Sequence, residues 1–334
     1  MRKRVLTPFR QYRVQVVVLA LTWLIFALTT PLFQGSDGVY SVLLAFPALG
    51  LIALGISITM MAGELDLSVT AVAVVAGVLA VKTSSAGLVP AILLATAAGT
   101  LFGCLQGWFV ARFRINSLIV TVGTLVMMNG LGFVLCHGAP LNVSELSVTD
   151  PLLERWGSFL APDIVVALVV FVIVGVFLAR TRYGRELHAI GGARNEAVTA
   201  GVPLRRTVMI AFAMSAGLAS LAGALSALKA GSIAPEAYES LLLKSITAAL
   251  VGGISLSGGR GTALNVGLGV AILSLLSAGL SSNAASDATI QLITGVVLLI
   301  VVVLEFATAL AARRVPGGPL AKSRLRRLVG PASP

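Results

Sequence analysis

The sequence predicts an all-α fold, a polytopic membrane helix bundle with about ten transmembrane helices. The chain is 57% hydrophobic and only 11% charged, which is far more apolar than a soluble domain. It contains many uncharged runs near the roughly 18–20 residues that a helix needs to cross a hydrocarbon core of about 30 Å. No segment alternates apolar and polar residues over the roughly ten positions of a transmembrane β-strand.

Apolar segments separated by charged or Gly-rich stretches define the predicted spans. The basic N-terminus and the apolar run after it lack a small-residue cleavage site, so we expect a first span rather than a signal peptide. Gly99, Gly103 and Gly107 recur every four residues and predict a face on which another helix packs closely. The spans are residues 14–33, 41–62, 67–82, 88–111, 117–137, 163–180, 207–229, 241–256, 262–280 and 288–311.

The positions of the charges orient these spans. Basic residues beside membrane helices concentrate on the cytoplasmic side, so we place the N-terminus inside, and an even number of spans returns the C-terminus there. The Lys and Arg residues that then fall outside are only Lys82, Arg155, Lys229 and Lys244. The acidic residues that fall outside are Asp37, Glu145, Asp150, Glu154, Asp163, Glu236, Glu239 and Asp287. We therefore predict a multi-pass protein of the cell inner membrane with both termini cytoplasmic.

Three regions follow from this topology. Residues 1–13 form a basic cytoplasmic N-terminus, residues 14–311 the transmembrane domain, and residues 312–334 a mobile basic tail expected to meet anionic lipid headgroups. The net charge of +11 lies beside apolar segments, so we predict contact with the lipid bilayer and no nucleic acid partner. Cys104 and Cys136 lie in apolar stretches and are expected to act as small apolar residues rather than as a disulfide.

The link between the second and third spans carries two acids, Glu64 and Asp66, in the sequence GELDLSV. Asp66 can cap the third span by accepting from amides of its first turn, where the helix dipole also favours a negative charge. A carboxylate among membrane helices is otherwise a candidate for a direct functional role. Because both acids fall near the interface, we favour the capping role and keep a ligand role as the alternative.

The eighth span ends in VGGISLSGGRGT, and its LSGGR resembles the signature loop of ABC ATPases. A phosphate loop requires Lys and then Ser or Thr directly after its second glycine, but Gly258 is followed by Gly259 and Arg260. We therefore predict a tight glycine turn between two spans. No catalytic residue, cofactor site or metal site is predicted in the chain.

The stretch from Arg180 to Arg206 interrupts the apolar pattern with six arginines on the predicted cytoplasmic side. Such a loop either satisfies the positive-inside rule alone or forms a docking surface for a partner. Local signals predict two short helices within it, which charge sorting alone would not require. We therefore favour a docking surface for a cytoplasmic partner.

The signals for these helices are local. Asn195 occupies an N-cap position, Glu196 follows in the first turn, and Gly201 suits the position after the C-cap, so a short helix is predicted between them. An earlier helical piece over residues 185–190 is expected to break at the glycine pair that follows it. The two helices and their glycine joint would form a stiff knob beneath the membrane.

Four segments together resemble the permease subunits of the ribose-type family of ABC sugar importers. They are GELDLSV from Gly63, SLIVTVGTLVMMNGL from Ser117, GRELHAIGGARNEAVTAGVP from Gly184 and AALVGGISLSGGRGTALNVGLG from Ala248. Their order and spacing agree along nearly the whole chain. The sequence departs from the family pattern at Leu65, where Ile is usual, and at Ala193-Arg194, where Asn and a small residue are usual. These departures leave open which sugar is carried, but they do not change the family that the chain resembles.

The resemblance implies a type II-like ABC importer permease that is a transport subunit and not an enzyme. Two permease subunits, as a homodimer or heterodimer, would form the pore above two cytoplasmic ABC ATPase subunits, and a periplasmic or lipoprotein sugar-binding protein would deliver the substrate. The ATPase-coupling residues, within a segment spanning 181–206, would be Gly184, Arg185, Glu186, Ala189, Ile190, Gly191, Gly192, Asn195, Glu196, Ala197 and Gly201. The structural or gating motifs would comprise Glu64, Asp66, Ser68, Gly252, Gly253, Ser257, Gly258, Gly259, Arg260 and Gly261.

Polar residues on otherwise apolar spans are candidates for a translocation path. Hydroxyls and amides can guide a polyhydroxy solute without holding it tightly, although each is more often an interhelical hydrogen bond. Outer loops 138–162 and 230–240 are expected to meet the sugar-binding protein through their acids. The path candidates are Thr121, Thr124, Asn129, Ser245 and Thr247.

Two other classes of function remain as alternatives. An ion-coupled secondary transporter would place ionisable groups at mid-membrane, and the nearest candidate is Glu305 at the inner end of the last span. A membrane-embedded enzyme would need reactive side chains around one cavity, but His137 and His188 are predicted on opposite sides. The resemblance does not name the sugar, because pentoses, deoxyhexoses, hexoses, sugar alcohols and a furanose-like quorum signal all fit members of the family.

Overall fold

The computed structural model describes residues 12–314, and the side chains of residues 12–304. The described chain is mostly helical, so the predicted all-α class is confirmed. The predicted tail, most of the N-terminal segment and the side chain of Glu305 lie outside what is described. The α-helices are α1 (Arg13–Thr29), α2 (Ser36–Leu43), α3 (Leu51–Met61), α4 (Val69–Lys82), α5 (Leu88–Phe113), α6 (Ser117–Leu135), α7 (Asp150–Leu153), α8 (Pro162–Arg180), α9 (Arg182–Gly192), α10 (Arg194–Thr199), α11 (Leu204–Ala230), α12 (Glu239–Gly252), α13 (Ala263–Ser282) and α14 (Asp287–Arg314).

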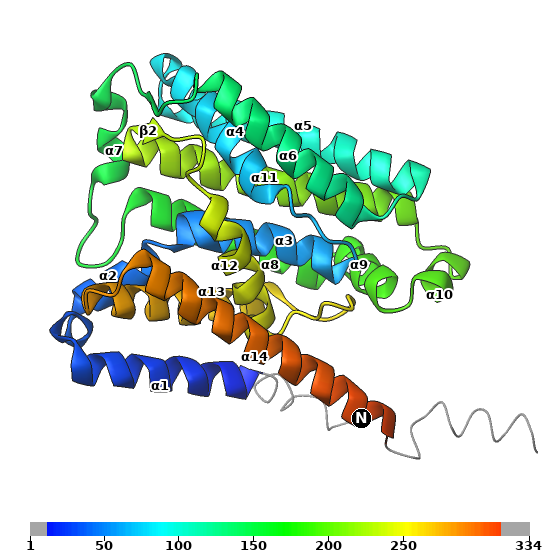
Figure 1. Cartoon of the computed structure of the whole chain (residues 1–334). Helices are drawn as coiled ribbons and strands as arrows, with labels where there is room; N and C mark the ends of the chain where they lie inside the picture. Colours follow the sequence, from blue (N-terminus) through cyan, green and yellow to red (C-terminus); the bar gives the residue numbers. More distant parts are fainter. Residues whose placement is uncertain (1–11, 315–334) are drawn as a thin grey trace, which may run out of the picture.

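Most of the long helices lie side by side in one bundle (Figure 1). Helices α9 and α10 lie at one end of the bundle, at the right of the view, and we call this the α9–α10 end. Helix α7 and strand β2 (Ser232–Ile233) lie at the opposite end, which we call the α7–β2 end. Helix α12 runs steeply across the direction of its long neighbours. The bundle therefore has two distinct ends and one helix that does not follow its axis.

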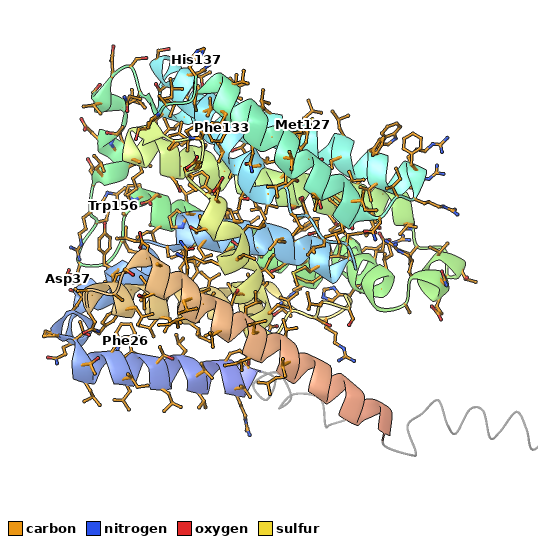
Figure 2. All side chains as sticks on the ribbon, in the orientation of Figure 1. Phe26, Asp37, Met127, Phe133, His137 and Trp156 are labelled. Carbon is orange, nitrogen blue, oxygen red and sulfur yellow. The ribbon has the colours of Figure 1, made fainter. Side chains whose placement is uncertain are left out.

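Burial separates a central layer from an outer layer. Every residue of α3 is buried, and α11 packs against α3, α4 and α5 in the middle of the bundle. Helices α5, α6, α8 and α14 instead present large apolar side chains outward. Met127 of α6, labelled in Figure 2, is 57% exposed. Such an apolar exterior is what a bundle surrounded by lipid requires.

Each of the ten predicted spans coincides with a helical segment. Seven helices of the described chain are long and apolar enough to cross a membrane, whereas α1, α4 and α12 have only 17, 14 and 14 residues. Helices α1, α4 and α12 are therefore shorter than the roughly 20 residues that a full membrane crossing requires. The second span begins at Ser36 rather than at residue 41 and contains a π-helical turn at Phe46–Gly50. This turn includes Pro47, which cannot donate a backbone hydrogen bond.

The predicted glycine face of α5 packs against α11. A Cβ at Gly99 would overlap the Ser220 side chain, and one at Gly107 would lie 2.8 Å from the Cα of Met209. A Cβ at Gly103 would overlap the carbonyl oxygen of Phe212. The prediction of a closely packed helix face is therefore confirmed. Both cysteines are free, as expected.

Residues predicted on the outer side gather at the α7–β2 end. Strand β1 (Leu141–Asn142) pairs antiparallel with β2 and so ties together the two predicted outer loops. Arg155 forms an ion pair with Asp37 at 2.6 Å, and the Lys229 ammonium donates to both carboxylate oxygens of Asp163 at 2.8 Å. Figure 2 shows Asp37, His137 and Trp156 at this same end. The loops and charges predicted to share a side of the membrane thus share an end of the bundle.

Candidate coupling site

Helix α9 follows α8 directly and packs one face against the bundle. Its N-terminus is capped by Thr181, whose hydroxyl oxygen accepts from the Gly184 amide at 3.4 Å. The helix runs through both glycines of the predicted joint, so the break predicted there is wrong. The chain changes direction one residue later at Ala193, whose non-helical backbone separates α9 from α10. The buried residues of α9 are Tyr183, Gly184, Leu187 and Ile190.

Helix α10 is short and mostly exposed. Ala193 rather than Asn195 occupies its N-cap position, so the predicted cap is wrong. Glu196 lies in the first turn, and Gly201 follows the helix with φ of 86°, both as predicted. The predicted coupling residues divide by burial into exposed (Arg185, Gly192, Asn195, Glu196, Gly201), half-buried (Glu186, Ala189, Gly191) and buried (Gly184, Ile190, Ala197).

Three glycine-containing segments meet at the α9–α10 end. A Cβ at Gly191 would overlap the carbonyl oxygen of Met61 and crowd the amide of Gly259. The Gly259 amide donates to that same Met61 oxygen at 3.0 Å. Gly258, with φ of 81°, lies directly against the backbone of Gly63. We call Gly63, Gly191, Gly258 and Gly259 the glycine junction, because here the coupling segment, the α3–α4 link and the Gly-rich turn touch backbone to backbone.

Two side chains reinforce this junction. The His188 ring lies between the carbonyl oxygens of Gly184 and Gly261, with Nδ1 at 2.7 Å and Nε2 at 2.9 Å. Arg194 forms an ion pair with Glu64, whose side chain is only 8% exposed. The coupling segment is therefore bonded to both of the other motifs. Sequence reasoning missed His188 and Arg194 because nothing local indicates that residues 73 and 130 positions apart will meet.

A cavity of about 740 Å³ lies beside the glycine junction. Its walls come from the α3–α4 link, the turn between α5 and α6, helix α10 and the start of α11. Helix α10 contributes Arg194, Asn195, Val198 and Thr199 to the lining. A displacement of α10 would therefore change the shape of this cavity as well as strain the junction.

Asp66 lies inside the bundle rather than at the interface. Its carboxylate accepts from the amide and hydroxyl of Ser68 at 3.1 and 2.6 Å and from the hydroxyl of Ser215 at 2.9 Å. The Gln106 amide donates to the Ser68 hydroxyl at 3.2 Å. Helix α4 begins at Val69, so Asp66 bonds the residue before the helix and the predicted capping of the first turn is wrong. The network instead ties the α3–α4 link to α5 and α11.

The Gly-rich segment after α12 forms a turn between two helices, as predicted. The carbonyl of Gly252 accepts from the side chains of Gln15 and Asn265 at 2.9 and 2.7 Å. Gly253 ends α12 in the left-handed conformation with φ of 100°. Ser257 and Arg260 are exposed on this turn. The turn thus pins the end of α12 to α1 and α13 while its glycines enter the junction.

The predicted path residues have different surroundings. Three of their hydroxyls donate to backbone carbonyls: Thr121 to Leu65 at 3.2 Å, Thr124 to Val120 at 2.9 Å and Thr247 to Leu243 at 2.7 Å. The Ser245 hydroxyl is buried without a hydrogen-bond partner in the described part of the chain. Asn129 lines a small cavity between α4, α6 and α12.

The fold and this site define a class of protein, a polytopic membrane helix bundle that presents a partly exposed helical segment at one end. No solved structure matches the chain. The family model described as "Branched-chain amino acid transport system / permease component" matches residues 38–302. The chain therefore belongs to this family of ABC transporter permeases.

Individual relatives agree with this assignment. The chain is 31% identical to the L-arabinose ABC transporter permease protein AraH of Azospirillum brasilense, over 87% of the chain and 86% of the relative. It is 31% identical to the ribose import permease protein RbsC of Bacillus subtilis, over 77% and 80%. It is 30% identical to the fructose import permease protein FruG of Bifidobacterium longum, over 77% and 79%. All three are transport permease subunits.

Proposed function

We propose that this chain imports a monosaccharide or related polyol across the inner membrane. The three relatives are named for L-arabinose, ribose and fructose, which supports a sugar rather than the branched-chain amino acid of the family description. The permease works with a second permease subunit, identical or related, and with separate ATPase subunits that hydrolyse ATP. A periplasmic or lipoprotein sugar-binding protein supplies the substrate.

The contact of the coupling segment, residues 181–206, with the α3–α4 link and the Gly-rich turn at the glycine junction carries this proposal. Helix α10 exposes Asn195 and Glu196, and its Arg194 forms an ion pair with Glu64 of the α3–α4 link. Helix α9 is bonded to the Gly-rich turn through His188 and packs Gly191 against the backbone of Met61. ATPase subunits that close on binding ATP would hold α10 and move α9 with it. Contacts made with only one state of the ATPase shift the equilibrium between inward-open and outward-open forms of the bundle.

The two ends of the bundle then have separate partners. The α9–α10 end faces the cytoplasm together with both termini, and the basic tail meets anionic lipid headgroups. The α7–β2 end faces the sugar-binding protein through loops 138–162 and 230–240. The exposed acids of these loops, which include Glu145 and Glu236, would pair with basic groups on that protein.

Reconstitution tests this function. The permease is placed in proteoliposomes with the ATPase and sugar-binding protein encoded beside it, and a panel of sugars is screened for stimulated ATP hydrolysis and for uptake. We expect at least one sugar to stimulate both. Sugar uptake driven by an ion gradient without ATP would contradict the proposal and support a secondary transporter.

Cysteine labelling tests the orientation. In an Arg194→Cys variant lacking Cys104 and Cys136, a membrane-impermeant thiol reagent should label the new cysteine in inverted vesicles and not in intact cells. Labelling from outside would reverse the proposed topology.

A further inference from the structure

A second cavity, of about 210 Å³, lies between α4, α6 and α12, away from the glycine junction. Its lining combines apolar side chains with one hydroxyl, one amide and one carboxylate. We propose that this cavity contacts the transported sugar, with Glu239 and Asn129 as the groups that bind its hydroxyls. The proposal rests on the proposed import of a polyhydroxylated solute. The lining residues are Thr70, Val74, Leu125, Asn129, Glu239 and Leu242.

The depth of Glu239 is the first argument. Leu125 and Asn129 lie within α6, several residues from either end of that helix, and both share the cavity with Glu239. Helix α12 begins at Glu239, after a non-helical segment that returns from the α7–β2 end. The sequence prediction placed this acid in an outer loop. Instead it lies beside the interior of a membrane-spanning helix, where an ionisable group marks a solute pathway more often than a structural position.

The second argument is that Glu239 lacks a protein partner. Three acids packed within the bundle or at the glycine junction are bonded: Asp66 to Ser215, Asp163 to Lys229 and Glu64 to Arg194. In the described chain, neither an ion pair nor a side-chain hydrogen bond satisfies the Glu239 carboxylate, and the side chain is exposed. An unpaired carboxylate next to apolar helices is costly unless it faces water or a polar solute.

The third argument is the architecture around the cavity. Helices α4 and α12 have 14 residues each, so each is about 21 Å long and shorter than the hydrocarbon core. Both begin beside this cavity, because Thr70 lies in the first turn of α4, and Glu239 and Leu242 lie in the first turn of α12. Helices that begin within the membrane are a recurrent way to place polar groups at a transport site.

The chemistry of the lining fits a sugar. A carboxylate accepts hydrogen bonds from vicinal hydroxyls, an amide both donates and accepts, and the Thr70 hydroxyl adds a third polar contact. Val74, Leu125 and Leu242 offer an apolar surface to the C–H face of a sugar ring. The cavity is smaller than the roughly 300–1,000 Å³ of sites that enclose drug-sized ligands. It therefore suits brief contact with a small solute rather than tight enclosure.

Uptake by reconstituted variants tests the proposal. Proteoliposomes containing the permease, its ATPase and its sugar-binding protein are supplied with radiolabelled L-arabinose, D-ribose, 2-deoxy-D-ribose or D-fructose. We expect Glu239→Gln to lower the uptake of the transported sugar about tenfold, because a hydrogen bond to a charged acceptor is lost. The loss should be smaller for an analogue lacking the bonded hydroxyl. Asp287→Asn is the matched control, because Asp287 is also an exposed acid that begins a helix, and its uptake should match the wild type.

Thiol protection gives a second measurement that does not depend on a working Glu239 variant. In a background lacking Cys104 and Cys136, Asn129→Cys should react with a water-soluble thiol reagent, and the transported sugar should slow the reaction. A modification rate that the sugar does not change, or uptake and sugar preference that Glu239→Gln does not change, would overturn the proposal. If the wild-type complex takes up none of the sugars, the proposed import function fails, and this inference fails with it.

Discussion

Helices α9 and α10 are neighbours in the chain, yet they are held in opposite ways. Helix α9 buries Tyr183, Leu187 and Ile190 against the bundle, and its His188 is bonded to the Gly-rich turn. Helix α10 has Ala197 as its buried residue and exposes the others. One helix is part of the transmembrane body, and the other is a surface available to a partner.

If this segment couples the permease to an ATPase, as proposed, the difference explains how a short segment could transmit force. A flexible loop would absorb a displacement, whereas α9 contacts the α3–α4 link and the Gly-rich turn through backbone atoms that have no rotamers to adjust. Closely packed interfaces switch between discrete arrangements rather than deform continuously. In the proposed coupling mechanism, helix α10 would bind the ATPase, and α9 would pass its displacement to the transmembrane helices.

The largest expected effect comes from filling the glycine junction. Gly191→Val should abolish ATP-driven uptake, because its side chain would overlap Met61 and Gly259 and strain the site by about 3 kcal/mol, the upper end for an overpacked position. Gly192→Ala is the control, because a Cβ there would lie 3.8 Å from the Cα of Gly259, an ordinary contact. Uptake assays and immunoblots of membrane fractions measure both. An equal loss of uptake in the two variants would show that the Gly191-Gly192 pair itself matters, rather than the close packing of the glycine junction.

The next effect in size concerns the exposed helix. Glu196→Lys should weaken binding of the ATPase about tenfold while leaving the permease in the membrane, because it reverses a charge on α10 without touching the bundle. Co-purification of the ATPase with the detergent-solubilised permease measures this. Asp287→Lys makes the same kind of change in an exposed acid of α14 and should leave ATPase binding unaltered. Weakened binding in both variants would argue against a specific α10 surface.

The ten helical segments could be predicted from the sequence because hydropathy and charge act locally. Boundaries such as residues 88–111 for α5 and 163–180 for α8 agree with the structure to within two residues. The short helix α10 is also predicted, from the first-turn acid Glu196 and from Gly201, although the Asn195 cap and the glycine break before it are wrong.

What the sequence could not provide was the set of contacts between distant segments. Asp66 is predicted near the interface because it lies in the link between two spans, but the chain folds back so that its partner is Ser215, 149 residues away. The same limitation hid the depth of Glu239 and the meeting of Gly63, Gly191 and Gly259. These depend on how elements pack together, which no local pattern encodes.

A charge swap measures how strongly the exposed helix is tied to the link. Arg194→Glu should lower uptake about threefold, because it faces a like charge at Glu64, but the partly exposed pair contributes no more than about 1 kcal/mol. Combining it with Glu64→Arg should restore part of the uptake. If the relative uptake of the double variant is no higher than the product of the relative uptakes of the two single variants, this ion pair does not couple the segments.

The smallest effect should come from Tyr183→Phe, which loosens α9 without disturbing its packing. The hydroxyl of Tyr183 donates to the Thr207 carbonyl at 3.1 Å. Burial, and secondarily the carboxylate of Glu186, raises the pKa of Tyr183 above its ordinary value. The hydroxyl therefore stays protonated in the folded protein above about pH 10, where an unfolded tyrosine ionises.

The stability from this buried phenol is fully present below about pH 10 and is lost as the pH rises above it. Tyr183→Phe should lower the local stability of α9 by about 1 kcal/mol at neutral pH and remove this alkaline loss. Hydrogen exchange by mass spectrometry should show faster exchange of α9 amides in the variant, while α10, already exposed, exchanges at its wild-type rate. Faster exchange in both helices would mean that α9 and α10 open as one unit, and the distinction between an anchored helix and a docking helix would then fail.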